Sequence, residues 1–208
     1  MKFNFRKFLL CFAILQAVVF VGGCSATWLT AVGALLPALE AAVAAAISFV
    51  VALEGKTVPP AVSAAIQKIG ADIKAQIANA QTLIADYQKA ATTGLLSQIQ
   101  AVFQGVVDNL ASILSAFNVT DSASISKFTQ LVGLCVAAAQ AVLAMIPLVA
   151  AKLALPATQS QLEHEDKVAA STIQLTNKTM QETYRIIVSE DTPSAIVNEA
   201  LATLPKTI

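Results

Sequence analysis

No charged side chain occurs between Lys127 and Lys152, and this long apolar stretch constrains the fold more than any other feature. Its strongly apolar residues recur at alternating spacings of three and four, the period of one face of an α-helix. The other faces are apolar as well, with residues such as Leu131 and Leu143. A helix that is apolar all round must be buried, either by protein or by lipid. The stretch therefore predicts a long interior or membrane helix that ends before Pro156.

Composition and spacing predict further helices. Apolar residues make up 56% of the chain and charged residues only 12%, and much of the apolar share is alanine, the best helix former. We expect helices over residues 25–53, 60–91 and 95–117, the first of them bent at Pro37. The second and third carry clear apolar stripes. The predicted fold class is all-α, an antiparallel bundle of about four long helices, in which such stripes are buried against one another.

The composition becomes polar after Pro156. A weaker apolar stripe through residues 158–191 is compatible with one more helix packed on the bundle. The alternative is a short hairpin, with a turn at 176–178 and a strand-like stretch at 184–188. Thr192 and Pro193 look like the cap and first position of a short final helix that ends near Leu204.

The first residues of the chain have the order of a secretory signal peptide. A basic start is followed by an apolar run over residues 8–21, and two glycines stand directly before Cys24. The basic residues are Lys2, Arg6 and Lys7. The four residues Val21-Gly22-Gly23-Cys24 resemble a lipobox, so the chain resembles bacterial lipoproteins over roughly its first 24 residues. The resemblance implies that the signal peptide, 1–23, is removed and that Cys24 becomes the lipid-bearing first residue.

The same resemblance implies a place in the cell. Several acyl chains on one cysteine hold a protein firmly at a membrane. Ser25 stands where an aspartate would often signal retention in the inner membrane, so the resemblance implies the outer membrane, facing the periplasm. Trp28 is expected either at the lipid–water boundary or in the core. The predicted organisation is a removed signal peptide over 1–23, an alanine-rich helical bundle over 24–155 and a polar C-terminal segment over 156–208.

Charge and cysteine usage exclude several classes of partner and site. Without residues 1–23 the chain keeps 10 Lys and Arg against 13 Asp and Glu, a formal net charge of −3. That balance does not provide the clustered basic surface that nucleic acids require. Cys11 leaves with the signal peptide and Cys24 would carry lipid, so Cys135 remains without a disulfide partner. Its apolar neighbours predict that Cys135 is packed as a small hydrophobe.

Several familiar catalytic, phosphate-binding and metal-binding motifs are missing from the sequence. The lone histidine, His164, lies among Glu163, Glu165 and Asp166, but consecutive residues of a helix point in different directions. No second histidine or cysteine stands at ligand spacing, and neither a Gly-x-Ser-x-Gly elbow nor a phosphate-binding glycine loop occurs. Glu40, the charge inside the first helix, is expected to face solvent rather than to act as a buried acid. We therefore predict no enzymatic activity, no cofactor and no metal.

Two functional hypotheses follow. The first is a lipid-anchored, non-enzymatic helical bundle that contacts the membrane through Cys24 and has a structural role or binds an envelope protein, with no small-molecule substrate. The alternative is a membrane-inserting, pore-forming-like protein that uses helices around 31–53 and 131–155. Length allows both segments to span a bilayer. On an insertion scale, however, Glu40 nearly cancels the apolar residues of the first segment, and Gln140 and Pro147 weaken the second. We therefore prefer the bundle.

Overall fold

The computed structural model describes the backbone of residues 26–153 and 159–208 and the side chains of residues 28–146 and 170–208. The predicted signal peptide, residues 1–23, and Cys24 lie outside the described residues. Within these ranges the long elements are all α-helices, and the only β-type contact is an isolated bridge between Glu54 and Val58. The all-α prediction is therefore confirmed.

The expected helices are found with small differences at their ends. The described elements are α2 (Ala26–Ala52), α3 (Pro60–Lys89), α4 (Thr93–Ala116), α5 (Ser122–Leu153), α6 (Gln159–Ser189) and α7 (Ala195–Ala202). Helix α2 continues through Pro37, which lies on its exposed edge. Pro60 opens α3, because the first turn of a helix does not need the N–H that proline lacks.

Side-chain caps explain two of the shifted helix ends. Thr92 Oγ1 accepts a hydrogen bond from the Leu95 N–H at 3.2 Å, so α4 begins at Thr93, two residues before the predicted start. Ser194, not Thr192, caps α7, so the predicted cap is wrong. The reason is local, because the Thr192 hydroxyl donates to Asn198 Oδ1 at 2.8 Å and holds the turn before the helix.

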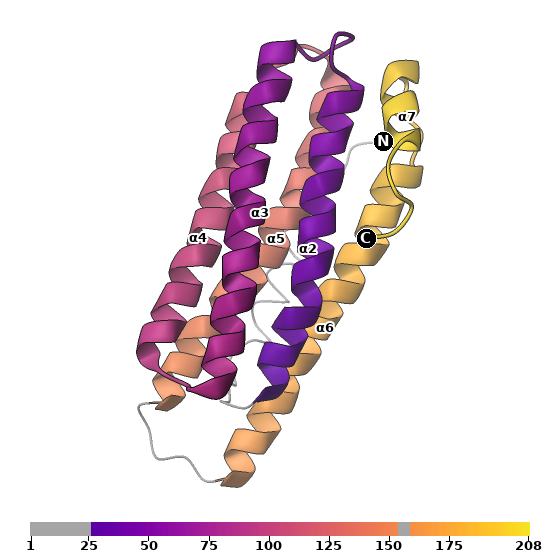
Figure 1. Cartoon of the computed structure of the whole chain (residues 1–208). Coiled ribbons are helices and arrows are strands. Elements are labelled where there is room, and N and C mark those ends of the chain that lie inside the picture. The colour runs from indigo at the N-terminus through magenta and orange to yellow at the C-terminus, as the bar shows by residue number, and fades with distance from the viewer. Residues whose placement is uncertain (1–25, 154–158) are drawn as a thin grey trace.

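Helices α2, α3, α4 and α5 run alternately up and down and close a ring of contacts (Figure 1). Helix α2 packs against α3, α3 against α4, α4 against α5, and α5 returns to α2. Helix α6 lies outside this ring and packs against both α2 and α5, while α7 contacts α2 and α6. Neighbours along the chain are antiparallel, and α6 runs in the same direction as α2.

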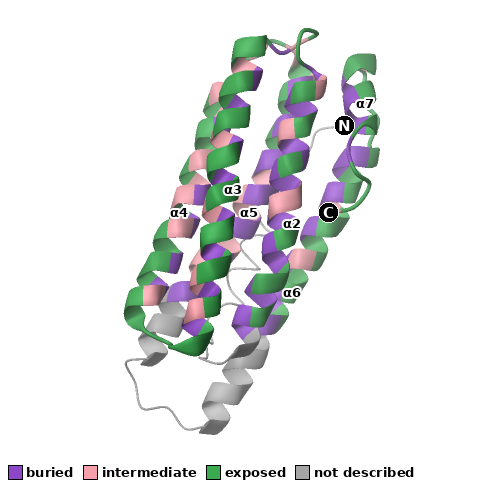
Figure 2. Cartoon of the chain, viewed as in Figure 1, coloured by how far each residue is buried: buried purple, intermediate pink, exposed green. Residues whose placement is uncertain are grey.

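The core runs along the inner faces of the helices (Figure 2). On α3 and α4 the predicted apolar stripes are buried at three-four spacing, including Ile66, Ile73 and Phe103. Helix α5 is covered on several sides, because every residue from Leu131 to Ile146 is buried or half-buried. The stretch that is apolar all round thus meets α2, α4 and α6 rather than a single neighbour.

Helix α3 approaches both of its neighbours closely at a glycine. A Cβ atom on Gly70 would collide with the Ile47 side chain of α2. On the other side, a Cβ atom on Gly105 of α4 would lie 2.6 Å from Gln76 Nε2 of α3. Asn109 Nδ2 also donates to Gln76 Oε1 at 3.1 Å, which fixes the register of α3 against α4.

The C-terminal segment is helical, so the hairpin alternative over 158–191 is wrong. Tyr184, Ile187 and Val188, which lie in or beside the strand-like stretch, are buried together on one side of α6. Helical spacing places these β-branched and aromatic side chains on the face that packs on the ring, and this tertiary burial outweighs local strand propensity. Tyr184 also donates its hydroxyl to the Pro205 carbonyl oxygen at 2.9 Å, which holds the chain end after α7.

Candidate functional site

The described part of the chain begins two residues after the predicted lipid-bearing Cys24. Cys24 itself lies outside the described residues, but α2 starts at Ala26. Trp28 and Leu29 are already in the core, with 1% and 3% of their surface exposed. Of the two placements expected for Trp28, the core is therefore the one observed. The start of α2 lies at the lower end of the bundle (Figure 1).

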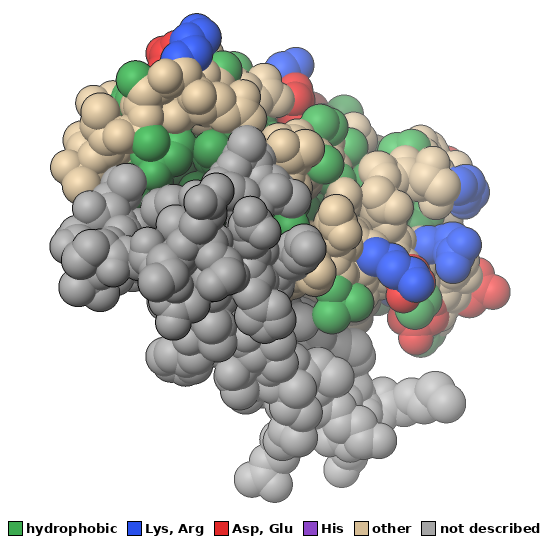
Figure 3. Space-filling model, turned by 90° about the horizontal axis from the view of Figure 1, so that it is seen from below, with side chains coloured by type: hydrophobic (Ala, Val, Ile, Leu, Met, Phe, Trp, Pro, Cys, Tyr) green, Lys and Arg blue, Asp and Glu red, His purple; other side chains and the backbone are tan. Residues whose placement is uncertain are grey.

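Each end of the bundle then has a defined position relative to the start of α2. The lower end, seen from below in Figure 3, also carries the α3–α4 turn, and its visible basic and acidic side chains are interspersed. The upper end is made by the α2–α3 loop, the α4–α5 loop and α7 (Figure 1). With 27 residues in α2 and a rise of about 1.5 Å per residue, the two ends are roughly 40 Å apart. We call the upper end the distal end.

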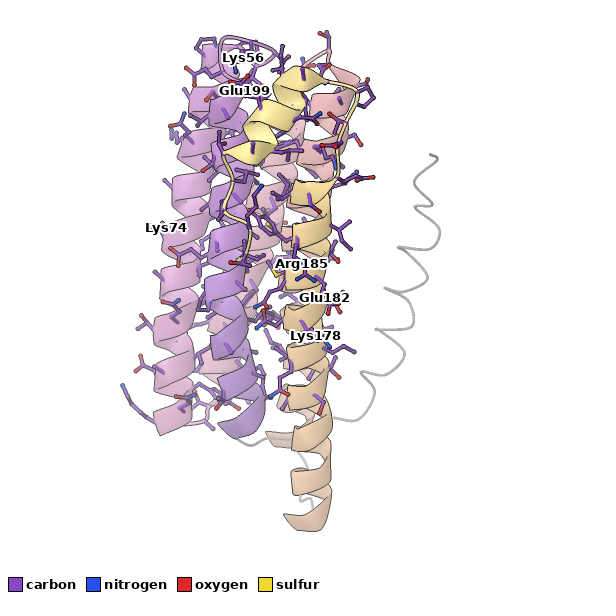
Figure 4. All side chains as sticks on the ribbon, turned by 90° about the vertical axis from the view of Figure 1, so that its right-hand side faces the viewer. Lys56, Lys74, Lys178, Glu182, Arg185 and Glu199 are labelled. Atoms are coloured by element: carbon purple, nitrogen blue, oxygen red, sulfur yellow. The ribbon has the colours of Figure 1, made fainter. Side chains whose placement is uncertain are left out.

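Polar contacts between segments far apart in the sequence converge at the distal end. Gly55 takes a positive φ of 72° in the α2–α3 loop, a conformation that glycine adopts easily. Next to it, Lys56 Nζ and Glu199 Oε2 of α7 form an ion pair of 2.9 Å, and these two side chains face each other in Figure 4. Both are well exposed, so this pair adds little stability. It does mark the loop and α7 as one polar surface.

The start of α5 is fixed by a second group of contacts at the distal end. Asp121 Oδ2 accepts the Ser124 N–H at 2.7 Å, an N-cap interaction. Hydrogen bonds from Ser124, from its side chain first and its backbone second, lower the pKa of Asp121. The Ser124 hydroxyl is fully buried and lies 3.3 Å from Thr57 Oγ1 of the α2–α3 loop. These contacts join α5 to that loop.

A buried lysine joins α5 to the end of α6. Lys127 is only 3% exposed, and its Nζ donates to the Ile187 carbonyl oxygen at 3.1 Å and to Glu190 Oε2 at 2.9 Å. A positive charge is favourable at a helix C-terminus, where carbonyl oxygens lack partners in the helix. Sequence reasoning did not identify this residue. The available signal was its place as the last charge before the apolar stretch.

Ser124 and Lys127 also have the Ser-x-x-Lys spacing that some acyl-transfer enzymes use for a nucleophile and its base. In this chain the two side chains point to different partners. The Ser124 hydroxyl meets Thr57, while the Lys127 ammonium meets Ile187 and Glu190. A nucleophile and its base must lie within hydrogen-bond reach of each other. The described contacts of this pair are instead those of a structural joint between α5, the α2–α3 loop and α6.

Cys135 is placed as predicted, inside the core. It is fully buried, and its Sγ donates to the Leu131 carbonyl oxygen at 3.4 Å. Burial raises the thiol pKa to about 12 by penalising the thiolate, and this outweighs a hydrogen bond from the backbone of Cys135 itself, which lowers the pKa. A thiol in this environment stays protonated at physiological pH and is a poor nucleophile.

The remaining sequence-predicted residues do not form a cluster. Glu40 is half-buried at the surface, with Oε1 3.6 Å from Lys74 Nζ of α3, which confirms that it faces solvent. The side chains of His164 and its acidic neighbours lie outside the described residues. Among the described side chains, no three His, Cys, Asp or Glu residues are grouped so that they could hold a metal ion. The exposed charges labelled on α6 in Figure 4 include Lys178 and Glu182, with 3.9 Å between Lys178 Nζ and Glu182 Oε1.

Two of the described helices are long and apolar enough to cross a membrane. They are Trp28–Ala52 of α2 and Ser122–Ile146 of α5. In the bundle, 56% and 50% of the residues in their most apolar windows are buried. Core helices of soluble proteins pass the same test, so length and composition do not choose between the two hypotheses.

Comparison of the chain with models of protein families, with curated proteins and with solved structures gave no match.

Proposed function

We propose that this protein is a lipid-anchored, non-enzymatic lipoprotein with a structural or protein-binding role at the cell envelope. The observation that carries the proposal is the short distance in sequence between the lipobox-like Val21-Gly22-Gly23-Cys24 and the buried Trp28. A lipid on Cys24 would attach a folded helical unit directly to the membrane surface. We place this unit at the outer membrane, facing the periplasm.

The folded unit in this proposal is an antiparallel bundle of the four long helices α2 to α5, with the C-terminal segment packed on it. Its apolar helices are used to build the core, and the acyl chains would supply membrane attachment. A tethered chain does not need a transmembrane helix in addition. The burial of about half of each apolar window supports this division of roles.

The distal end is the part of the bundle best placed to meet an envelope protein. It lies roughly 40 Å from the attachment point, beyond the headgroups to which the lower end would be held. It also carries the paired charges of Lys56 and Glu199 and the exposed Ile196 of α7. A mixed polar and apolar surface of this kind is typical of protein-binding sites.

Metabolic labelling with palmitate tests the anchor. The wild-type chain should incorporate label, and Cys24→Ser should abolish incorporation. Cys135→Ser is the matched control, because it also removes a cysteine but should leave labelling unchanged. Label that persists in Cys24→Ser, or that disappears in Cys135→Ser, would contradict lipidation at Cys24.

The alternative, membrane insertion through α2 and α5, is compatible with the length and apolar character of these two helices, which core helices share. The test replaces residues 1–24 with an ordinary cleavable signal, so that the released chain has neither lipid nor leader. The bundle proposal expects this chain in the soluble periplasmic fraction, with the lipidated wild type in the membrane pellet as the control. Recovery of the released chain in the pellet after carbonate extraction would instead support insertion.

Photo-crosslinking from two ends of the lipidated protein tests the protein-binding role. One photoreactive residue replaces Ile196 at the distal end, and another replaces the exposed Gln88 near the α3–α4 turn. We expect a discrete crosslinked protein from position 196 and none from position 88. Crosslinks from position 88 only would place the partner at the membrane end and overturn the distal assignment.

A further inference from the structure

The outer face of α6 carries the two most exposed large apolar side chains in the described part of the chain. Leu175 is 51% exposed and Ile186 is 62% exposed. They are eleven residues apart, which is about three turns, so both lie on one side of the helix. That side is opposite to the buried Met180 and Tyr184 and faces solvent. Two apolar residues in line on a solvent-facing helix have the spacing of anchors for a partner helix.

Charged side chains accompany this apolar line. Lys178 and Arg185 are seven residues apart, nearly two turns, and follow one another along α6 in Figure 4. Glu182 lies between Leu175 and Ile186 on the same side, with its Oε1 3.9 Å from Lys178 Nζ. Arg185 has no acidic partner among the described side chains. An unpaired guanidinium therefore stands next to the more exposed of the two apolar residues.

Arg185 is also the only arginine after the predicted signal peptide. Arginine is enriched and lysine depleted at protein interfaces, and arginine is frequent among the residues that contribute most to binding. Its planar guanidinium can donate two parallel hydrogen bonds to one carboxylate, which a lysine ammonium cannot do. The charge-complementary group for this position is therefore a carboxylate on the partner.

The charges disfavour two other occupants of the same face. A second copy of the face, related by a two-fold axis near its centre, would place Lys178 opposite Arg185 and Glu182 opposite its own copy. Like charges placed directly opposite one another repel. A bilayer surface also fits poorly, because helices that lie on membranes present a continuous apolar face, and Glu182 interrupts this one. A different protein with its own complementary charges remains.

We propose that the outer face of α6, from Leu175 to Ile186, binds an amphipathic helix of an envelope protein, and that a carboxylate of that helix pairs with Arg185. This inference rests on the proposed protein-binding role and deepens it by naming a surface and the chemistry of the partner. Apolar residues of the partner cover Leu175 and Ile186, and the carboxylate sets the register. The contact extends over roughly 16 Å of helix, so the interface is small and the complex is reversible.

Photo-crosslinking from this face of the full-length lipidated protein tests the inference. A photoreactive residue replaces Thr179, which is exposed and uncharged, and the crosslinked peptide is identified by mass spectrometry. We expect a peptide of another protein with helical apolar spacing and an Asp or Glu. Arg185→Glu should lower the yield about tenfold or more, because like charges would then meet. Lys68→Glu is the matched control, since it reverses an exposed charge on α3 and should leave the yield unchanged.

A charge swap tests the pairing directly. Replacing the identified carboxylate of the partner by lysine should restore the yield with Arg185→Glu. Ile186→Ser should lower the yield several-fold, whereas Ile125→Ser, which changes an exposed apolar residue of α5, should not. Thermal melts equal to wild type verify that these surface variants fold.

Several results would overturn the inference. They are no crosslink from position 179, a crosslink only to lipid or to a second copy of the chain, a yield that Arg185→Glu leaves unchanged, and no rescue by the charge swap. A crosslink from position 196 without one from position 179 would leave the protein-binding role standing and would reject this face alone. Palmitate labelling at Cys24 is independent of all these outcomes.

Discussion

Replacing Lys127 by methionine should destabilise the fold although it removes a buried charge. Methionine has a similar length and refills the space, which limits the cavity cost. The Ile187 carbonyl oxygen, however, loses the donor that now lies 3.1 Å away. Leaving a buried acceptor without a partner costs about 1–3 kcal/mol. Release of the ammonium from its buried site offsets part of that cost. We expect a net loss of about 1–2 kcal/mol in the free energy of unfolding, for these two reasons together.

Thermal unfolding followed by circular dichroism at the helical band measures this loss. For a chain of this size each kcal/mol lowers Tm by roughly 2–4 °C, so Lys127→Met should unfold roughly 2–8 °C below wild type. Lys74→Met is the matched control, because its side chain is 73% exposed and pairs with Glu40 only at the surface. The control should stay within about 0.5 kcal/mol of wild type.

A second variant separates the two contacts of Lys127. Glu190→Gln keeps the carbonyl hydrogen bond and removes the negative charge, which belongs to a side chain that is 58% exposed. Because that partner is largely hydrated, the variant should cost less than about 1 kcal/mol. Two results would refute the view that the buried carbonyl contact contributes most of the stability that Lys127 provides. One is a Lys127→Met protein as stable as wild type, and the other is a Glu190→Gln protein less stable than Lys127→Met.

Four further predictions concern the core and the chain end that packs on it. Gly70→Ala should lower the free energy of unfolding by about 1–3 kcal/mol, because its new methyl meets Ile47. Gly133→Ala has open space at its Cβ and should raise that free energy by up to about 1 kcal/mol. Urea unfolding of the two variants should therefore give changes of opposite sign. Cys135, whose thiol pKa is raised to about 12, should react with a disulfide reagent at pH 8 only after unfolding, and fast reaction of the folded chain would contradict its burial. Tyr184→Phe removes one hydrogen bond to a backbone carbonyl and should lower stability by about 0.5–1.5 kcal/mol. Since burial raises the Tyr184 pKa to about 12 as well, the folded state should be fully stable below about pH 9 and should lose stability as the pH rises toward 12, which a pH series of melts measures.

The regular helices could be predicted because each has a regular apolar spacing within its own stretch of sequence. On α3, Ile66, Ile73 and Ile77 repeat at helical spacing and are all buried. The less regular stripe of α6 left a hairpin open, because 176–178 resembles a turn and 184–188 resembles a strand. In the structure Thr172 and Thr176 instead occupy core positions of a helix. These threonines are tolerated inside because a hydroxyl can bond within its own helix, as Thr176 Oγ1 does to the Thr172 carbonyl oxygen at 2.9 Å.

The contacts of the distal end could not be predicted, because their partners are distant in sequence. Lys127 is buried by a helix end that follows it by some 60 residues. A local pattern describes the side of a helix on which a residue lies, and it contains no information on which helix will cover that side. The wrong cap at Thr192 has a local cause instead, because its hydroxyl donates to Asn198 in the turn before α7.

The two helices that are apolar on all sides, α2 and α5, and the polar C-terminal segment are explained by the same packing arrangement. In a ring of four helices each helix needs one apolar face, and α3 and α4 have that pattern. Helices α2 and α5 each contact α6 in addition to their two neighbours in the ring. They therefore need a wider apolar surface than α3 and α4. The polar composition after Pro156 therefore does not indicate a separate tail. Helix α6 is amphipathic, and its buried residues, such as Ile173 and Met180, lie on a helix that packs against both α2 and α5. The apolar excess that makes α2 and α5 look like membrane helices is, on this reasoning, the binding site for α6.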